Sequence, residues 1–325
     1  MTGKFVISLD FELLWGVRDK RTVANYGDAV LGARRAIPEM LSLFARNGIR
    51  ATWACVGLLF FRDRNELLDA LPDDRPSYAN PRFDPYASIE TAVGQSEQDD
   101  PYHYGSSLID RIAKTPGQEI GTHTFSHFYC LEEGQSIRSF RADLAAAAKV
   151  AGRRGIRLQS IVFPRNQMTN DHLAACADYG ILAYRGNPRG WAYDPRAQGL
   201  QTMPVRLGRY LDSFFDLFGS QTPMLRPSEN LPRNIPASRF LRPRGRLALQ
   251  NRLRLDRVMA EMQNAATIGG LYHLWWHPHN FGRRTEENMQ DLKVLIEHYQ
   301  LLKLRYGFET VTMGELAARG LAAAG

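Results

Sequence analysis

Cysteine is scarce in this chain. Only three cysteines, Cys55, Cys130 and Cys176, occur among its 325 residues, and no two of them form a Cys-x-x-Cys pair. Neither a disulfide framework nor a thiolate zinc site is therefore indicated. We interpret the three residues as small buried hydrophobic side chains in a reducing compartment.

The chain also lacks long apolar runs. No stretch reaches the roughly 18 apolar residues that a membrane span needs. The apolar run that begins at Phe5 is short and continues into Asp10 and Glu12, without a small-residue cleavage site, so it is not typical of a signal peptide. We therefore expect a cytoplasmic protein, in which residues 213–219 (SFFDLFG) are a candidate for peripheral contact with a membrane.

Positive charge, by contrast, is in excess. The formal net charge is +7 and the isoelectric point is about 9.4, while the apolar fraction of 44% is that of an ordinary globular protein. Such an excess is compatible with nucleic acid, an anionic membrane surface or a phosphate-bearing substrate. The basic residues are not interleaved with a recognisable nucleic-acid-binding fold, so we expect no nucleic-acid partner.

One local pattern recurs four times: a helical segment, then a glycine, then a short run rich in β-formers. The glycines, Gly48, Gly155, Gly180 and Gly307, suit the left-handed position that ends a helix. Helices and strands that alternate at this spacing predict an α/β fold with a mostly parallel sheet. The expected strands are 4–10, 50–57, 118–123, 159–164, 181–185, 270–277 and 308–311, and the expected helices are 28–47, 105–115, 137–153, 170–179, 254–267 and 284–306.

Seven strands are one unit short of an eight-stranded α/β barrel. A last helix is expected to begin at Thr312, whose spacing to Glu315 fits a capping box. We expect the whole chain, 1–325, to form a single domain. Two segments, at about 62–104 and 206–253, interrupt the alternation, and we expect them to be insertions over the mouth of the barrel.

Two histidines follow directly after one expected strand. His123 and His127, in GTHTFSH, are four residues apart, which places both imidazoles on one face of a helical turn. The carboxyl ends of parallel strands are where barrels build their active sites. The pair is therefore a candidate metal site, although two unrelated polar loop residues would show the same spacing.

Two carboxylates end the first strand. Asp10 and Glu12 follow the apolar run FVISL, and a buried parallel strand seldom ends in this way unless the carboxylates are paired or bind a ligand. One carboxylate would complete a metal site with the two histidines, and the other would accept a proton from an attacking water. A helix cap with a salt bridge is the alternative interpretation.

The segment LYHLWWHPHN contains further candidates. On a strand, His273, Trp275 and His277 point to the same side. His277 ends the strand, where its imidazole could act as general acid toward a leaving amine, whereas His273 lies deeper and suits a supporting role in the core. His279 and Asn280 are either substrate contacts or structural turn residues.

A fourth strand end and several aromatic residues complete the candidate site. Arg165 and Asn166 follow the apolar run SIVFP. Arg165 could orient a catalytic carboxylate, and both residues could contact substrate, although a solvated loop position is the alternative. The aromatic side chains proposed to stack on a sugar ring are Trp15, Trp191, Tyr184 and Trp275.

Taken in order, these motifs resemble the polysaccharide deacetylase family, carbohydrate esterase family 4 with its NodB homology domain, from the first strand to about residue 316. The resemblance implies a distorted (β/α)7 barrel with the two segments as insertions. It assigns Asp10 as catalytic base, Glu12, His123 and His127 as metal ligands and His277 as general acid. SLDFE differs from the usual first motif, so the roles of Asp10 and Glu12 could be exchanged.

The resemblance also implies a cofactor and a reaction. The cofactor is a divalent metal ion, in the first place zinc, with cobalt, nickel or manganese as substitutes. The reaction is removal of the N-acetyl group from an amino sugar of a surface polysaccharide, or from its nucleotide- or lipid-linked precursor. Nine arginines between residues 226 and 257 favour a phosphate-bearing substrate, although a solvated surface loop would show the same composition.

Two alternatives remain open at this stage. Relatives of the family cut other C–N bonds, in cyclic imides, ureides or formamides. The family's Arg-x-x-Pro-x-Gly motif reads FPRNQM here, with Arg165 as the expected replacement for its arginine. That departure is compatible with a catalytically silent member that binds glycan. The oligomeric state does not follow from the sequence.

Overall fold

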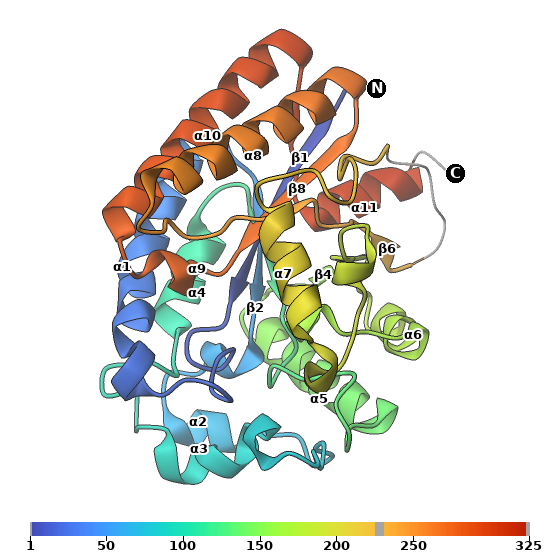
Figure 1. Cartoon of the computed structure of the whole chain (residues 1–325). Coiled ribbons are helices and arrows are strands. Elements are labelled where there is room, and N and C mark those ends of the chain that lie inside the picture. Colours follow the sequence, from blue (N-terminus) through green and yellow to red (C-terminus); the bar gives the residue numbers. More distant parts are fainter. Residues whose placement is uncertain (1, 225–230, 323–325) are drawn as a thin grey trace.

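The apolar run that follows Lys4 forms the middle strand of a parallel sheet. Strand β1 (Lys4–Phe11) is buried along its whole length except at Lys4, and it pairs with β2 (Ala51–Cys55) and with β8 (Leu271–Trp276). Burial on both faces explains why these three strands are almost continuously apolar. The structure is a computed structural model, and it describes residues 2–224 and 231–322 (Figure 1).

The sheet has nine strands within the described residues. Their order is β6-β5-β4-β3-β2-β1-β8-β7, with β9 paired to the start of β1, and every pairing is parallel. The remaining strands are β3 (Gln118–Thr122), β4 (Ser160–Ile161), β5 (Ala183–Tyr184), β6 (Arg233–Asn234), β7 (Arg239–Phe240) and β9 (Glu309–Thr310). The sheet curls, and the barrel is incomplete because, among the described residues, β6 and β7 remain as two unpaired edges.

The strands alternate with helices that cover the outside of the curl. The helices are α1 (Val23–Asn47), α2 (Arg64–Leu68), α3 (Tyr86–Ala92), α4 (Ser106–Lys114), α5 (Ile137–Gly152), α6 (Asn170–Asp178), α7 (Met203–Asp212), α8 (Ala248–Ile268), α9 (Pro278–Phe281), α10 (Thr285–Tyr306) and α11 (Met313–Ala322). Figure 1 shows α8 and α10 side by side along one flank, in contact with each other. None of the described helices combines the length and the apolar composition that a membrane crossing requires.

Alternation along β1 decides which of its side chains reach the functional site. Phe5, Ile7 and Leu9 belong to a large apolar cluster that includes side chains of α1, whereas Val6 belongs to a smaller cluster with Met313 of α11. Residues two apart on a strand share a face. The interior of the curl is therefore apolar near α11, and it becomes polar toward Asp10 at the carboxyl end of the strand.

The predicted elements are confirmed in outline. Each of the seven expected strands and seven expected helices has a counterpart, and the four helix-ending glycines have φ angles from 61° to 75°. The capping box is present, since Thr312 N donates to Glu315 Oε2 (3.0 Å) and Glu315 N donates to Thr312 Oγ1 (3.2 Å). The expected α/β fold, a distorted barrel, is therefore correct, and the single-domain organisation stays a prediction.

The two segments expected to be insertions differ from that expectation. Residues 206–253 are not external to the sheet, because they supply most of α7, both edge strands β6 and β7, and the start of α8. Residues 62–104 pack against the loop after β1, where Trp15 Nε1 donates to the His103 carbonyl (2.7 Å) and Arg18 donates to the Phe83 carbonyl (2.5 Å). The second segment therefore builds the barrel, and the first supports a loop beside its mouth.

Candidate active site

The carboxyl ends of four strands of the sheet converge on one cavity of about 510 Å³. Asp10 ends β1, His123 follows β3, Arg185 follows β5 and His277 follows β8. All four line the cavity, together with Glu12, His127, Asn166 and Trp275. Parallel strands deliver their carboxyl ends to the same edge of a sheet, which is why residues far apart in the sequence meet here.

Glu12, His123 and His127 form a cluster with the chemistry of a metal site. Their ligand atoms lie within 4.8 Å of one another, and Glu12 Oε2 is 3.2 Å from His123 Nε2 and 3.1 Å from His127 Nε2. The His123 Nδ1–H donates to the Val162 carbonyl (2.7 Å), so in the neutral ring Nε2 offers a lone pair. A buried carboxylate and two imidazoles that face one another suit a divalent cation.

The charge states favour the same interpretation. Burial lowers the pKa of His127 to about 3, so its imidazole is neutral at physiological pH. Burial alone would raise the pKa of Glu12, but His277, His123 and His127 outweigh it and hold the pKa well below its ordinary value. The cluster therefore consists of an ionised carboxylate and electron-pair donors, which fits the divalent metal ion expected from the sequence.

The two histidines do not share a helical turn, contrary to the expectation from their spacing. Thr124 and His127 have left-handed φ angles of 63° and 60°, so the segment after β3 is an irregular loop. Asp143 of α5 holds this loop by accepting hydrogen bonds from Phe125 N (2.6 Å), Ser126 N (3.0 Å) and the Ser126 hydroxyl. The ring centroids of the two histidines are consequently 4.9 Å apart.

Arg185 binds Asp10 through two parallel hydrogen bonds. Its Nη1 and Nη2 lie 2.7 and 2.8 Å from the two carboxylate oxygens of Asp10, and both side chains are buried. Burial alone would raise the pKa of Asp10, but the charge of Arg185 outweighs it and lowers the pKa below its ordinary value. Arg185 also donates to Ser8 Oγ (3.0 Å), which contacts His273 Nε2 (2.9 Å). His273 is thus a supporting core residue, as predicted.

Arg185 was missed by the sequence analysis, which gave the orienting role to Arg165. Arg165 instead pairs with Asp19 (2.6 Å) and Glu132 (3.1 Å), and its guanidinium covers the Tyr129 ring at 3.8 Å. It still lines the cavity, as does Asn166, whose Oδ1 accepts from Arg185 Nη2 (3.2 Å). The only sequence signal for Arg185 was its position directly after a short apolar strand.

His277 faces both carboxylates from the end of the neighbouring strand β8. Its Nε2 is 3.6 Å from Asp10 Oδ2 and 3.8 Å from Glu12 Oε1. Asn280 Nδ2 lies 3.2 Å from His277 Nδ1, so the side-chain amide orients the ring with Nε2 toward the cavity. His279 stacks on His277 with centroids 5.0 Å apart and is 4% exposed. The expected loop residues Asn280 and His279 thus hold the general-acid candidate.

The aromatic candidates divide into accessible and buried residues. Trp15 is fully buried and cannot stack on a sugar, contrary to expectation. Trp191 is 53% exposed but packs beside Phe218, and neither it nor Tyr184 lines the cavity within the described residues. Trp275 lines the cavity, with the Arg185 guanidinium 4.0 Å from its ring. Trp275 is therefore the aromatic surface that a ligand can reach.

Comparison with known proteins rests on the fold. No protein-family model and no curated protein matches the sequence. The structure is similar to a protein assigned as a polysaccharide deacetylase from Mycobacterium smegmatis, with a TM-score of 0.57, 14% identity, and coverage of 99% of this chain and 92% of that one. A protein with the same assignment from Pseudomonas aeruginosa gives a TM-score of 0.55, 11% identity, and coverage of 98% and 90%.

The same fold also occurs in a protein named for a different reaction. A 4-alpha-glucanotransferase from Thermococcus litoralis gives a TM-score of 0.54 at 11% identity, over 97% of this chain and 40% of that one. At such identities the similarity shows a shared fold, and a fold does not determine a reaction. The fold is that of the polysaccharide deacetylases, as the sequence motifs predicted, and the reaction has to be inferred from the residues of the cavity.

Proposed function

We propose that this protein is a metal-dependent deacetylase that removes the N-acetyl group from an amino sugar. The observation that supports this proposal best is the placement of a Glu-His-His cluster, an arginine-paired aspartate and a histidine around one cavity. Amide hydrolysis needs an electrophile for the carbonyl, a base for the attacking water and an acid for the leaving amine. The cavity offers a group for each requirement.

Glu12, His123 and His127 would hold the metal, and zinc is the first choice for a set of one carboxylate and two imidazoles. A divalent cation bound there supplies Lewis acidity, which polarises the acetamide carbonyl and makes a water easier to deprotonate. The ion pair of Asp10 with Arg185 leaves Asp10 ionised, so we assign it as the base rather than as a metal ligand.

Two side chains carry out the proton transfers of the proposed reaction. Asp10 accepts the proton of the attacking water, whose oxygen forms a bond to the acetyl carbon. His277, in its doubly protonated form, donates the Nε2 proton to the amine nitrogen as the C–N bond breaks and is left as a neutral imidazole; acetate and a free amino sugar result. Because Nε2 lies 3.6 Å from Asp10, a proton collected by the base has a short path to the acid for the next cycle.

For the substrate, we propose an amino sugar of a surface polysaccharide or of its nucleotide- or lipid-linked precursor, handled in the cytoplasm. Lys20, Arg206 and Arg209 line the cavity mouth and favour an anionic ligand. Peripheral contact with a membrane is supported by the exposure of Phe215 (60%) and Leu217 (48%). Cosedimentation with vesicles that contain anionic lipid tests this contact, and failure to bind them would contradict it.

The deacetylase proposal is tested by metal content and acetate release from a panel of N-acetylated amino sugars. We expect near-stoichiometric zinc in the wild type and its loss in His123→Ala/His127→Ala. Asp10→Asn should retain zinc and lose activity, because it removes the base and leaves the ligands. His298→Ala, which changes a histidine of α10 outside the cavity, is the matched control.

The outcomes separate the competing functions. Acetate release that requires both zinc and Asp10 would support the proposal. Ring opening of a cyclic imide or ureide by the same zinc protein, without acetate release, would assign a different C–N bond. Absence of zinc after reconstitution would refute the metal site, and a zinc protein that binds glycan without hydrolysis would be a silent member.

A further inference from the structure

The catalytic cavity continues into a second cavity of about 220 Å³. The two share four lining residues, namely Arg165, Asn166, Arg209 and Trp275. The second cavity extends away from the metal cluster, and its lining includes Arg209 of α7, Tyr193 of the segment before α7, Phe240 of β7 and Arg242 directly after that strand. A ligand whose acetamido group reaches the metal cluster can therefore extend into this second space.

Two arginines in the second cavity have no acidic partner within the described residues. Arg209 Nε donates to the Ala192 carbonyl (2.6 Å), and Arg242 Nη2 donates to the Arg209 carbonyl (3.3 Å). Neither guanidinium makes another hydrogen bond or an ion pair within residues 2–224 and 231–322. Backbone oxygens and aromatic rings thus hold two half-buried cations, and most of their N–H groups have no hydrogen-bond acceptor among the described residues.

A neighbouring arginine in the same wall shows what a structural arginine looks like. Arg239 also lines the second cavity, but its guanidinium contacts both carboxylate oxygens of Glu261 (2.6 and 2.8 Å) and the Asp212 carbonyl (2.7 Å). The charge of this buried arginine is therefore neutralised by a neighbouring carboxylate, as is typical of an arginine with a structural role. Arg209 and Arg242 lack this compensation, although Glu261 and Asp212 lie in the adjoining elements.

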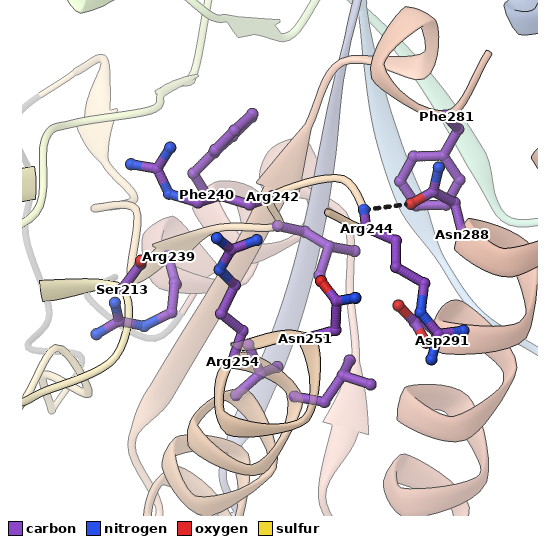
Figure 2. Close-up of a pocket in the computed structure, with 13 residues that line it drawn as sticks. Ser213, Arg239, Phe240, Arg242, Arg244, Asn251, Arg254, Phe281, Asn288 and Asp291 are labelled. Atoms are coloured by element: carbon purple, nitrogen blue, oxygen red, sulfur yellow. Dashed lines mark hydrogen bonds and ion pairs between the residues drawn. The ribbon is translucent and has the colours of Figure 1, made fainter. Parts of the chain in front are cut away.

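A third arginine adds to the positive charge at the far end. Arg254 of α8 and Arg242 line a common pocket, and Figure 2 shows Arg254 rising from its helix toward the strand segment that carries Phe240 and Arg242. Burial lowers the pKa of Arg242, and the nearby charge of Arg254 lowers it further. Burial also lowers the pKa of Arg209, with Arg196 and Arg242 acting in the same direction. Mutual repulsion of this kind is relieved when an anion binds.

The remaining walls suit a sugar ring beside an anion. The rings of Phe240 and Trp275 lie 4.6 Å apart, and both line the second cavity, Trp275 at its junction with the catalytic cavity. Asn187 offers amide donor and acceptor groups in the same wall. Among the described residues that line this cavity, the one carboxylate is that of Asp194, which is 66% exposed and pairs with Arg196. It does not neutralise Arg209 or Arg242.

We propose that Arg209 and Arg242 form a subsite for a phosphate or diphosphate ester attached to the amino sugar that is deacetylated. This inference rests on the proposed function, and it narrows the substrate to an activated, phosphate-linked sugar rather than a finished neutral polymer. Guanidinium groups from two different elements match two successive phosphates, because each planar fork binds one phosphate through two N–H groups. A nucleotide sugar and a sugar on a polyprenyl diphosphate share this chemistry.

The test is equilibrium binding to the zinc-loaded full chain. The probes are UDP-N-acetylglucosamine, N-acetylglucosamine linked to a polyprenyl diphosphate in detergent micelles, and the neutral oligosaccharide chitotriose. In Arg209→Gln and Arg242→Gln we expect each diphosphate probe to bind about 10-fold more weakly, and in the double variant about 100-fold, as expected for charge-assisted hydrogen bonds. Arg246→Gln removes an exposed charge of the same segment outside the cavities, and it should leave binding unchanged.

The three probes also separate the possible sources of the phosphate. Tighter binding of the nucleotide sugar would assign a soluble donor, and tighter binding of the polyprenyl probe would assign a lipid-linked one; both support the subsite. Equal affinity of the wild type for chitotriose and for both diphosphate probes would overturn the proposal. This comparison uses the wild type alone, so it does not depend on whether a variant folds. Unchanged diphosphate affinity in the folded double variant would overturn it too.

Failure of the subsite is distinguishable from failure of the proposed function. If the diphosphate probes bind through Arg209 and Arg242 but no probe releases acetate, the subsite stands and the deacetylase assignment falls. If acetate is released from chitotriose with zinc and Asp10 required, and the variants do not change diphosphate binding, the deacetylase stands and the subsite falls.

Discussion

Asp143 should support zinc binding as well as the stability of the fold. It is fully buried on α5 and accepts three hydrogen bonds from residues 125 and 126, between the two histidines of the metal cluster. In Asp143→Ala these donors lose their acceptor, and each donor left unsatisfied lowers the free energy of unfolding by about 1–3 kcal/mol. Burial raises the pKa of Asp143 to about 6. Its ionised form therefore costs about 3 kcal/mol at neutral pH relative to an ordinary aspartate, a cost that the variant removes.

The two contributions oppose each other in the free energy of unfolding. Three lost hydrogen bonds minus the recovered cost of burying a charge leave a net destabilisation of about 0–6 kcal/mol for the metal-free protein. The affinity for zinc has no such compensation, because the loop that carries His123 and His127 loses its anchor. Loss of a supporting contact behind metal ligands weakens metal binding by about 10- to 100-fold.

The assay is competition for zinc against a chromophoric chelator, beside urea unfolding of the metal-free protein. Asp178→Ala is the matched control, because that carboxylate lies 59% exposed on α6 in an ion pair with Arg141, and we expect its zinc affinity to be unchanged. Asp143→Asn, which keeps one acceptor, should lie between Asp143→Ala and the wild type. A folded Asp143→Ala protein that binds zinc as tightly as the wild type would refute the reasoning.

Two further predictions concern the groups behind the base. Arg185→Lys cannot form two parallel bonds to Asp10, so kcat/KM should fall about 10- to 100-fold with zinc content unchanged; a fall of the same size in Arg165→Lys would contradict the assignment. Burial lowers the pKa of His273 to about 3, below its unfolded value. Between pH 6.5 and about 3 the unfolded chain thus binds a proton that the folded protein refuses, and stability falls as pH falls, by at most about 1.4 kcal/mol per pH unit. In urea unfolding at pH 5 and pH 7, His273→Gln should reduce the slope by this residue's share, because burial also lowers the pKa values of His127, His172 and His279. An unaltered pH dependence would count against the prediction.

The parts of the site that the sequence predicted are those whose residues follow long apolar strands. Asp10 and Glu12 end an eight-residue strand, and His277 follows a six-residue one, so hydrophobic pattern and polar break were both visible. Strands β6 and β7 have two residues each, which is too short for any periodicity to register. The segment that contains them therefore looked like an insertion.

The residues that the sequence did not predict act through contacts between distant elements. Asp143 sits in the middle of a helix, where its burial depends on the loop after β3. Arg185 follows a strand of two residues and meets Asp10 only because the sheet curls. Trp15 looked like a sugar-stacking residue because of its place beside the first motif, but the segment ending at His103 covers it. Such partners are fixed by tertiary packing.

The pairing of β1 with β8 also has a consequence for the folding of the protein during its synthesis. Lys4 lies opposite Leu271 and Leu9 opposite Trp276. Most of the chain must therefore be synthesised before β1 can pair with β8. Contacts of such long sequence separation slow folding and leave an apolar edge open meanwhile. The proposed base and acid arrive on these two strands. A chain released from the ribosome before residue 271 would thus be prone to aggregate and would lack its general acid, so that activity and a finished core appear together.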